Sequence, residues 1–500
     1  MSESENAGER GTPSGGRLLW VVVLLTVGLC IGIALDVTPW LRGPSGQYEW
    51  RWYHHSFRLI PLRLLPVAVV AGLVGGWYWL ARKRERAGGW LLAALVPLSL
   101  ALQLSVLSTG PKGLELVARV LNPGYFGYYP DATRVENMAQ YLDTYADNQP
   151  ELANIHLQVH PPGNVVFLWG VYRAVAAVPA LTDLTTPYVE PHLSSLPDWI
   201  TDYSMTDITG AMVVSLLIPF SGALAVVPLY LLARTTFEEE TARRAALLYV
   251  LSPALTLFEP KMNVPYLVFT GLAFLLAYRG HQEERLLLTY LSGLVCSVAI
   301  FMSYSNVLLP PATGIFVLAG SFAGFGADPK AGWRRLVRRS LAFVVGVWSV
   351  QVFMTLAFGW DQIRSIEVMF DINPHYDVDR NYWYNLFYTP YSMLLLAGIP
   401  VGVLAVARVV RLVLASLRRE KLEVANWFLI GTILPLVVLM LSGNQRGENE
   451  RVFLYFMPVT VLFGAAESTR LGWDDRAFGI MAGLTFLQLM VFQAVLEVYL

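Results

Sequence analysis

The sequence is poor in charged residues and in cysteine. Only 15% of its 500 residues are Asp, Glu, Lys or Arg, and the formal net charge is −1. A charge so close to zero leaves no basic surface for nucleic acid, so no nucleic-acid partner is expected. The only two cysteines, Cys30 and Cys296, lie inside apolar segments. Buried thiols in such segments act as small apolar side chains, so no disulfide is expected.

Several catalytic motifs are also missing. The absence of a phosphate-cradling glycine loop argues against a P-loop enzyme, and the absence of paired zinc ligands at helical spacing argues against a zinc protease. There is no serine-nucleophile signature. Neither an internal repeat nor the inverted halves of many transporters can be detected.

Long apolar runs dominate what remains. Hydrophobic residues make up 55% of the chain, and runs near the 20-residue length that spans a bilayer recur throughout. They begin near Leu18, Pro61, Trp90, Ala211, Ala245, Val264, Leu287, Asn306, Leu341, Tyr391, Asn426, Val452 and Phe478. We therefore predict an all-α, polytopic transmembrane protein with about thirteen crossings and short interfacial helices in its external loops. A single membrane domain covers residues 18–500, after a disordered cytoplasmic tail at 1–17.

Basic residues give a topology, because Lys and Arg concentrate in cytoplasmic loops. The basic clusters are 82–86, 234 with 243–244, 279 with 285, 330–339 and 408–421. This pattern predicts a multi-pass protein of the plasma (cell) membrane with a cytoplasmic N-terminus. The segments predicted on the outer face are 37–58, 109–163, 258–265, 303–306, 359–389 and 442–451.

One apolar segment conflicts with this alternation. Residues 164–181 are short, and the acidic stretch 182–207 that follows contains no Lys or Arg. A complete crossing at 164–181 would place every later basic cluster outside. We therefore expect a re-entrant or partial helix here; if it does cross, another apolar segment must fail to.

The outer segment 109–163 is the longest polar stretch between apolar runs and is the first catalytic-type loop. It contains Asp131 just before a helical pattern. Asp131 is either an N-cap, since a helix start favours carboxylates, or a base or metal ligand beside the bilayer. The loop ends in His160-Pro161-Pro162-Gly163. The prolines suit entry into a helix, and His160 either satisfies a backbone carbonyl or contacts a phosphate or an acceptor.

Two further outer segments contain charges beside apolar runs, where charges are costly and usually face a cavity. Glu259 and Lys261 either neutralise each other, or Lys261 binds a phosphate while Glu259 assists Asp131 or a cation. Arg451 stands at a helix start, where a positive charge opposes the dipole. Its anionic partner is Glu448 or Glu450, or else a lipid-linked phosphate.

The second large outer loop, 359–389, is rich in aromatic and polar residues. Aromatic belts are common at membrane interfaces, but rings mixed with Asp, Asn and His also suit a carbohydrate. His375, Trp383 and Tyr388 from this loop, together with Tyr129 and His160 from the first, are the candidate substrate-binding residues.

The order of these features resembles the GT-C superfamily of integral-membrane glycosyltransferases, which includes protein O-mannosyltransferases and lipid A aminoarabinose transferases. The resemblance covers most of 109–465. It rests on Tyr129-Pro130-Asp131, Ala139-Gln140-Tyr141-Leu142, His160-Pro161-Pro162, Ser252-Pro253 with Glu259, and Gly447 to Arg451 with Pro458. The chain departs from the pattern in having Glu259 where the family usually has Asp, and in two additional hydrophobic segments before the first catalytic-type loop.

The resemblance implies an inverting transfer of a sugar from a polyprenyl-phosphate-linked donor to a hydroxyl of a lipid, polysaccharide or protein acceptor at the outer face. By this resemblance Asp131 is the base and Glu259 the secondary carboxylate. Lys261 and Arg451 are candidates for binding the donor phosphate. The metal requirement is open; a divalent cation such as Mg²⁺ or Mn²⁺ is one possibility. The alternatives are a transporter or flippase of lipid-linked sugars or other amphiphiles, and a non-catalytic scaffold among membrane lipids.

Overall fold

The chain is almost entirely helical in the residues that the computed structural model describes, which are 13–44, 50–57, 59–84, 89–110, 115–195, 197–322, 329–372, 380–420 and 422–497. The two strands in these ranges, β1 (Tyr53–His54) and β2 (Leu496–Glu497), pair antiparallel with Tyr53 opposite Glu497. The all-α prediction is confirmed.

Eight helical stretches among these described residues are long and apolar enough to cross a membrane. The helices that form them are α1 (Pro13–Ala34), α2 (Leu64–Arg82), α3 (Gly89–Leu107), α11 (Met205–Leu224) with α12 (Val226–Thr236), α17 (Leu309–Phe322), α18 (Pro329–Phe358), α22 (Ile399–Leu417) and α26 (Asp475–Val495). The protein is therefore a multi-pass membrane protein, as predicted. Helix α1 begins five residues before the predicted Leu18.

Shorter helices account for the other predicted segments. These are α13 (Glu239–Val250), α14 (Pro253–Leu257), α15 (Tyr266–Gln282), α16 (Leu286–Met302), α21 (Tyr382–Ala397), α23 (Asn426–Ser442), α24 (Asn449–Val452) and α25 (Met457–Arg470). Each of the thirteen predicted segments thus contains a helix. Several are too short to count as spans by length, so the number of crossings stays a prediction.

Two of the predicted apolar segments are interrupted. The segment near Tyr391 divides into α21 and α22 at Gly398, whose φ of +112° is one that residues with a side chain rarely adopt. The segment after His160 forms α9 (Gly163–Ala176) and α10 (Pro179–Val189), with a 90° bend between them. Fourteen helical residues reach about 21 Å, less than the ~30 Å hydrocarbon core. This bent pair is either a broken span or a re-entrant loop, so the re-entrant or partial helix stays a prediction.

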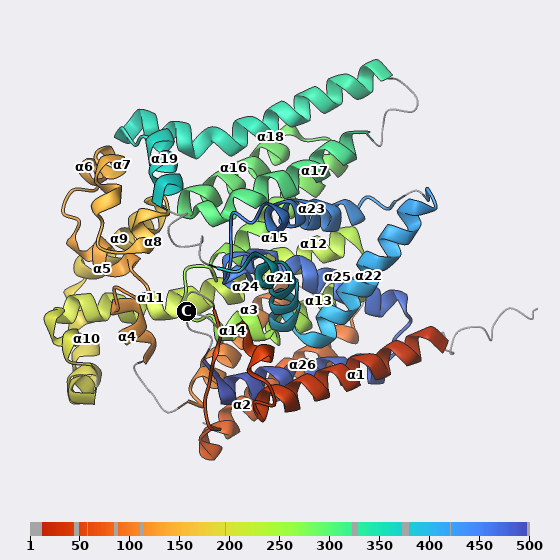
Figure 1. Ribbon diagram of the computed structural model, residues 1–500, viewed down its shortest axis with the longest axis horizontal. Helices are drawn as coiled ribbons and strands as arrows, with labels where there is room; N and C mark the ends of the chain where they lie inside the picture. Colours follow the sequence, from red (N-terminus) through yellow and green to blue (C-terminus); the bar gives the residue numbers. More distant parts are fainter. Residues whose placement is uncertain are drawn as a thin grey trace, which may run out of the picture.

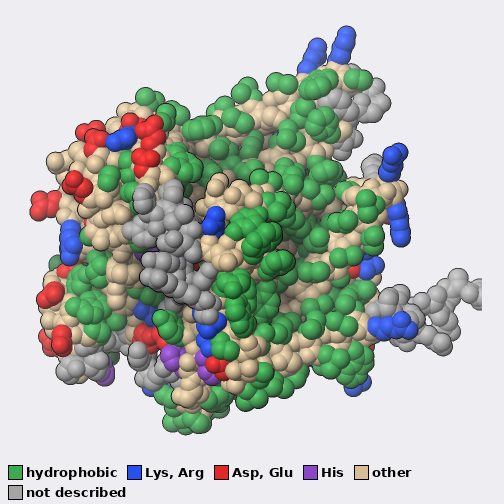
Figure 2. Space-filling model, viewed as in Figure 1, with side chains coloured by type: hydrophobic (Ala, Val, Ile, Leu, Met, Phe, Trp, Pro, Cys, Tyr) green, Lys and Arg blue, Asp and Glu red, His purple; other side chains and the backbone are tan. Residues whose placement is uncertain are grey.

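The short helices of the predicted outer loops gather at one end of the molecule, on the left of Figure 1. Besides α9 and α10 they are α4 (Glu115–Leu121), α5 (Tyr128–Arg134), α6 (Met138–Asp143), α7 (Tyr145–Asn148), α8 (Ile155–Gln158) and α19 (Gln362–Ile372). Figure 2 shows most Asp and Glu side chains at this end, and Lys and Arg side chains projecting at the opposite end. The start of α1 and the start of α18 lie at that basic end. This separation follows the charge map read from the sequence.

Glycines allow some helices to pack backbone to backbone. A Cβ on Gly293 of α16 would lie 2.2 Å from the carbonyl oxygen of Phe343 in α18, and a Cβ on Gly346 of α18 would lie 2.2 Å from that of Tyr290 in α16. Small residues at such crossings are typical of helix packing in membranes. The relative position of α16 and α18 is therefore closely fixed.

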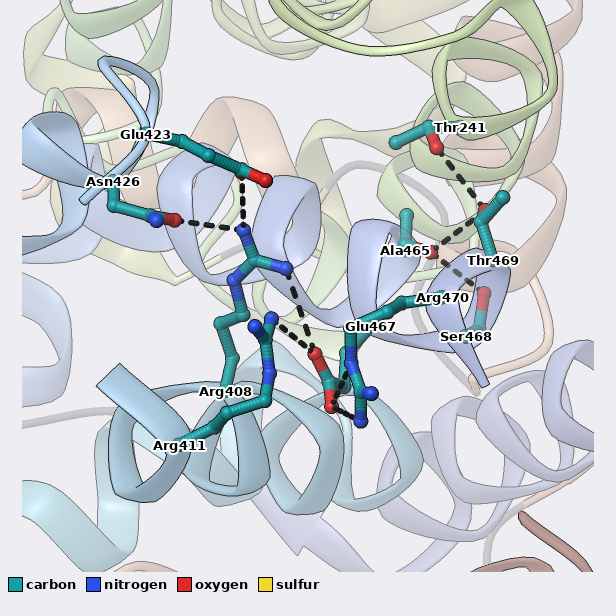
Figure 3. Close-up of polar contacts among 10 residues, drawn as sticks. All are labelled: Thr241, Arg408, Arg411, Glu423, Asn426, Ala465, Glu467, Ser468, Thr469 and Arg470. Carbon is teal, nitrogen blue, oxygen red and sulfur yellow. Dashed lines mark hydrogen bonds and ion pairs between the residues drawn. The ribbon is translucent and has the colours of Figure 1, made fainter. Parts of the chain in front are cut away.

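A cluster of charged residues joins α22, α23 and α25 (Figure 3). Glu467 of α25 is 1% exposed and accepts hydrogen bonds from Arg411 at 3.0 Å and from Arg470 at 2.9 Å. Arg408 lies 3.6 Å from the same carboxylate and donates to Asn426 at 2.7 Å. Three guanidinium groups thus share one buried carboxylate, which we call the Glu467 cluster.

Candidate functional site

Segments far apart in the sequence meet in one pocket at the acidic end, here called the cationic pocket. It has a cavity volume of about 50 Å³ and lies between the first outer loop, the turn before α15, the end of α16 and the segment before α25. Its lining residues are Tyr125, Phe126, Tyr128, His156, His160, Lys261, Met262, Asn263, Tyr266, Ser303, Ser305, Arg451 and Val452. This lining has two side chains that are normally cationic, two histidines and no carboxylate, so the pocket suits an anion.

Asp131 lies on a helix that also contributes to the pocket. Helix α5 begins after Gly127, whose φ of +73° makes the turn into the helix without a side-chain cap. Asp131 is the fourth residue of α5, so its interpretation as an N-cap is wrong. Tyr128 lines the pocket, and residues three apart share a helix face. Asp131 is thus on the same face of α5 as Tyr128, but it is not one of the residues that line the pocket.

The carboxylate of Asp131 accepts a hydrogen bond from the hydroxyl of Tyr141 at 2.7 Å. Burial raises the pKa of Asp131, while that hydrogen bond and nearby Arg134 oppose the shift. The Tyr141 ring lies 5.5 Å from that of Tyr145, whose hydroxyl donates to the carbonyl oxygen of His160 at 2.8 Å. Tyr141, which is partly buried, and the buried Tyr145 thus lie between Asp131 and the backbone of His160.

His160 and His156 line the pocket as neutral imidazoles. Burial and the charge of Arg451 lower the pKa of His160 to about 4, and burial lowers the pKa of His156 well below its usual value. The Nδ1 atom of His160 lies 3.3 Å from the hydroxyl of Ser303. Gly163 allows this approach, because a Cβ there would lie 2.0 Å from a carbonyl oxygen at the end of α16.

Lys261 is 5% exposed, and its ammonium donates to the carbonyl oxygen of Tyr125 at 2.7 Å, while lying 3.5 Å above the Tyr125 ring. Burial and the charge of Arg451 lower the pKa of Lys261. The expected Glu259–Lys261 pair is wrong, because the ammonium is directed to the first outer loop instead.

Glu448 is the anionic partner of Arg451, to which it forms an ion pair. Its other oxygen lies 3.5 Å from Arg380. Burial raises the pKa of Glu448, but Arg451, Arg380 and Lys261 together outweigh burial and lower it. One carboxylate behind the pocket thus faces three cationic groups, and the surroundings keep an excess of positive charge.

Glu450, the other partner considered for Arg451, is bound elsewhere. Its two oxygens accept hydrogen bonds from the indole of Trp52 at 3.1 Å and from Ser392 at 3.0 Å. The segment between α1 and α2, one of the departures from the GT-C pattern, therefore packs against the turn that contains Arg451.

Glu259 is fully buried and does not line the pocket. Among the described residues, neither of its carboxylate oxygens has a hydrogen-bond partner. Burial raises its pKa well above the usual value, which favours the neutral acid. Glu259 is therefore not placed to contact a ligand in the cationic pocket.

The candidate substrate-binding residues are dispersed in the structure. Of these residues, only His160 lines the pocket. Tyr129 is fully buried and donates to a backbone carbonyl of α11 at 2.8 Å. Trp383 is 63% exposed on α21. Tyr388 donates at 2.7 Å to a carbonyl in the 3₁₀ helix η1 (Pro39–Arg42). His375 lies outside the described residues.

Some lining residues were not predicted from the sequence. His156 is on α8 and His160 lies just beyond the end of that helix, so helical spacing does not relate the two; only His160 was a candidate. Ser303 and Ser305 fall in an expected outer turn, yet nothing in their local sequence distinguishes them. Tyr128 adjoins Tyr129, and the choice between neighbouring tyrosines depends on which one faces the pocket.

A divalent cation finds no ready site in the described part of the chain. No three His, Cys, Asp or Glu side chains there lie together in a way that could hold a metal ion. Neither Asp131 nor Glu259 is among the residues that line the cationic pocket. No catalytic step is therefore assigned to a metal.

Comparison with known families supports the resemblance. Residues 195–357 match the model of the family described as dolichyl-phosphate-mannose-protein mannosyltransferase, a GT-C family. The matched part is about a third of the chain and includes Glu259, Lys261 and Ser303. Asp131, His160 and Arg451 lie outside it. No curated protein gives a significant match to the chain.

One similar solved structure is the archaeal oligosaccharyltransferase AglB from Archaeoglobus fulgidus, in complex with an inhibitory peptide and a dolichol-phosphate. The two chains share 11% sequence identity with a TM-score of 0.36, and the match covers 81% of this chain. This chain spans only 56% of the length of that protein. A similarity this low carries no weight for the function.

Proposed function

We propose that this protein is a membrane glycosyltransferase that moves a sugar from a polyprenyl-phosphate-linked donor to an acceptor hydroxyl, with inversion at the anomeric carbon. The observation that carries this proposal is the cationic pocket, in which Lys261 and Arg451 converge from segments that are distant in the sequence. Asp131 lies on α5, the helix whose Tyr128 lines this pocket. The family that matches residues 195–357 is named for a dolichyl-phosphate-linked sugar, which supports this class of donor.

The donor phosphate binds in the cationic pocket. A sugar joined to a polyprenyl phosphate is a diester with one negative charge, and the departing polyprenyl phosphate gains a second. Lys261 and Arg451 stabilise the charge that develops as the bond breaks, which lowers the barrier rather than only tightening binding. The neutral imidazoles and serine hydroxyls of the pocket supply hydrogen bonds to the phosphate oxygens.

Asp131 acts as the base. It takes the proton of the acceptor hydroxyl as the acceptor oxygen forms its bond to the anomeric carbon, and the bond from that carbon to the phosphate oxygen breaks with its electron pair. The raised pKa of Asp131 favours this role, because a base works best when its pKa approaches the operating pH. The carboxylate must still be ionised in the resting enzyme.

The site lies on the outer face of the cell membrane in this proposal, with the N-terminus in the cytoplasm. Support comes from the charge separation of Figure 2, since the acidic end holds the pocket and the basic end holds the start of α1. Basic ends of membrane proteins face the cytoplasm. Acceptors reach the site from outside as lipid, polysaccharide or protein.

Reconstitution with polyprenyl-phosphate sugars and an envelope extract tests the activity. We expect a glycosylated product and an equal amount of released polyprenyl phosphate by mass spectrometry. The Asp131→Asn variant should give neither, while the control Asp147→Asn, an exposed carboxylate of the same loop, should behave as wild type. Movement of the lipid-linked sugar across the bilayer without a covalent product would instead show a transporter.

A further inference from the structure

A second pocket rich in arginine lies at the opposite, basic end of the molecule. It has a cavity volume of about 280 Å³ and lies between α18 and the turn that joins α15 to α16. Its lining residues are Glu284, Leu286, Ala331, Arg334, Arg335, Arg338 and Arg339. Neither the proposed reaction nor the family match accounts for this pocket.

The four arginines occupy one side of α18, because positions i, i+1, i+4 and i+5 are neighbours on a helix. Arg339 is 4% exposed and donates to Nδ1 and to the carbonyl oxygen of His281, both at 3.1 Å. Arg335 lies 3.4 Å from Glu284, which is the only carboxylate of the lining. One negative charge therefore opposes four positive charges.

The other two arginines are available to a ligand. In the described part of the chain, neither Arg334 nor Arg338 forms a hydrogen bond or an ion pair. Guanidinium groups bind phosphate oxygens with two parallel hydrogen bonds, which makes arginine the preferred side chain for such groups. Both remain at the wall of the pocket, where a phosphate would be held between them.

The pocket is held in shape by the helix crossing beneath it. Gly293 and Gly346 bring the backbones of α16 and α18 into contact, so α18 cannot rotate its arginine face away from the turn. The buried Arg339, fixed on His281, secures the same face from inside. The pocket is thus a built feature rather than a chance gap between side chains.

Apolar side chains border the arginines on the surface of α18. Trp333 and Val337 are each 57% exposed, and Leu341 is 61% exposed. Trp is typical of the level of lipid head groups, and α18 is one of the candidate spans. A free phosphate would need no apolar border, whereas a phospholipid presents its phosphate and its acyl chains side by side. Basic pockets beside membrane helices bind such head groups.

We propose that this pocket binds the phosphate of an anionic phospholipid from the leaflet at the basic end of the molecule. The phosphate of the bound lipid would lie between Arg334 and Arg338 of α18, beside the α15–α16 turn. This site is independent of the proposed glycosyl transfer, since it lies at the other end of the molecule.

Native mass spectrometry of protein taken from phosphatidylcholine bilayers with 20% phosphatidylglycerol (roughly physiological anionic content) tests this assignment. We expect wild type to retain phosphatidylglycerol and an Arg334→Gln/Arg338→Gln variant to retain about tenfold less, the ratio that a loss of ~1.4 kcal/mol would give. The matched control Arg418→Gln/Arg419→Gln removes the same charge from the same end, at the exposed end of α22, and should retain the lipid as wild type does.

Wild type alone provides a second measurement that does not depend on variants folding. Phosphatidylglycerol should raise its melting temperature in a concentration-dependent way, because a ligand of the native state stabilises it. Neither phosphatidylcholine nor millimolar inorganic phosphate should do so. Equal lipid loss in the two double variants, or an equal shift with inorganic phosphate, would overturn the assignment to a phospholipid.

Discussion

The cationic pocket and the Glu467 cluster use similar charged side chains for different purposes. In the Glu467 cluster three arginines converge on one carboxylate that is 1% exposed (Figure 3). In the cationic pocket Lys261 and Arg451 border a cavity of about 50 Å³ whose lining contains no carboxylate. Both regions have more cationic groups than carboxylates. The first is packed between helices that it holds together, whereas the second borders a cavity that an anion can enter.

This difference shows how buried charge can be assigned to stability or to function. A buried charge that is matched by its own chain costs desolvation and mainly fixes helix positions. A buried charge that faces a cavity retains its attraction for a ligand, and perturbed charges in clefts mark functional sites. Mutations should therefore separate the two regions, with loss of activity at one and loss of stability at the other.

The largest effect should come from Asp131→Asn. Removal of a general base costs about 10²–10⁴ in kcat, while the isosteric amide still accepts the hydrogen bond from Tyr141, so folding should be unchanged. Turnover of the lipid-linked donor and the melting temperature measure the two quantities. Transfer at the wild-type rate would remove Asp131 from the mechanism.

Lys261→Met should come next. Losing one group that stabilises developing charge costs about 10²–10³ in kcat, and Lys261→Arg should recover part of it because a cation is restored. The control Lys83→Met removes an exposed lysine elsewhere and should leave kcat unchanged. If Lys261→Met lowered only the melting temperature, the cationic pocket would be no different from the Glu467 cluster.

Glu467→Gln should have the opposite effect, with loss of stability and no loss of activity. It leaves three arginines without their shared carboxylate, which should lower the free energy of unfolding by about 2 kcal/mol. This is below the value for fully buried pairs, since Arg411 and Arg470 are partly exposed. Thermal denaturation in detergent measures the loss. The kcat of the folded fraction should stay at the wild-type value, and a lower kcat would mean that the cluster takes part in function.

Tyr141→Phe should have the smallest effect of these variants. Its effect should appear in the pH dependence of activity. The hydrogen bond from Tyr141 stabilises the ionised carboxylate of Asp131 and so lowers its pKa. Without this bond, worth about 1 kcal/mol, the pKa rises further, and activity should begin to fall at a higher pH as the solution is made acidic. The pH profile of kcat/KM measures this shift. An unchanged acidic limb would show that Asp131 does not titrate in the reaction.

Much of the architecture could be predicted from the sequence because its signals are local. Runs of apolar residues and clusters of Lys and Arg predicted an all-α membrane protein and the charge separation of Figure 2. The break at Gly398 was missed, because a run of apolar residues does not reveal where its backbone turns. The number of crossings cannot be decided by run length when helices such as α15 and α16 are shorter than a typical span.

The sequence by itself determined that Asp131, His160, Lys261 and Arg451 are unusual residues beside apolar segments, because polar and charged groups are costly to desolvate there. Only the tertiary structure decided which of them meet. His160, Lys261 and Arg451 line one pocket together with His156, whereas Glu259 is buried and does not line it. The physical reason is that burial and pairing depend on contacts between distant segments, such as Lys261 with Tyr125 and Arg451 with Glu448, and no local pattern records those contacts.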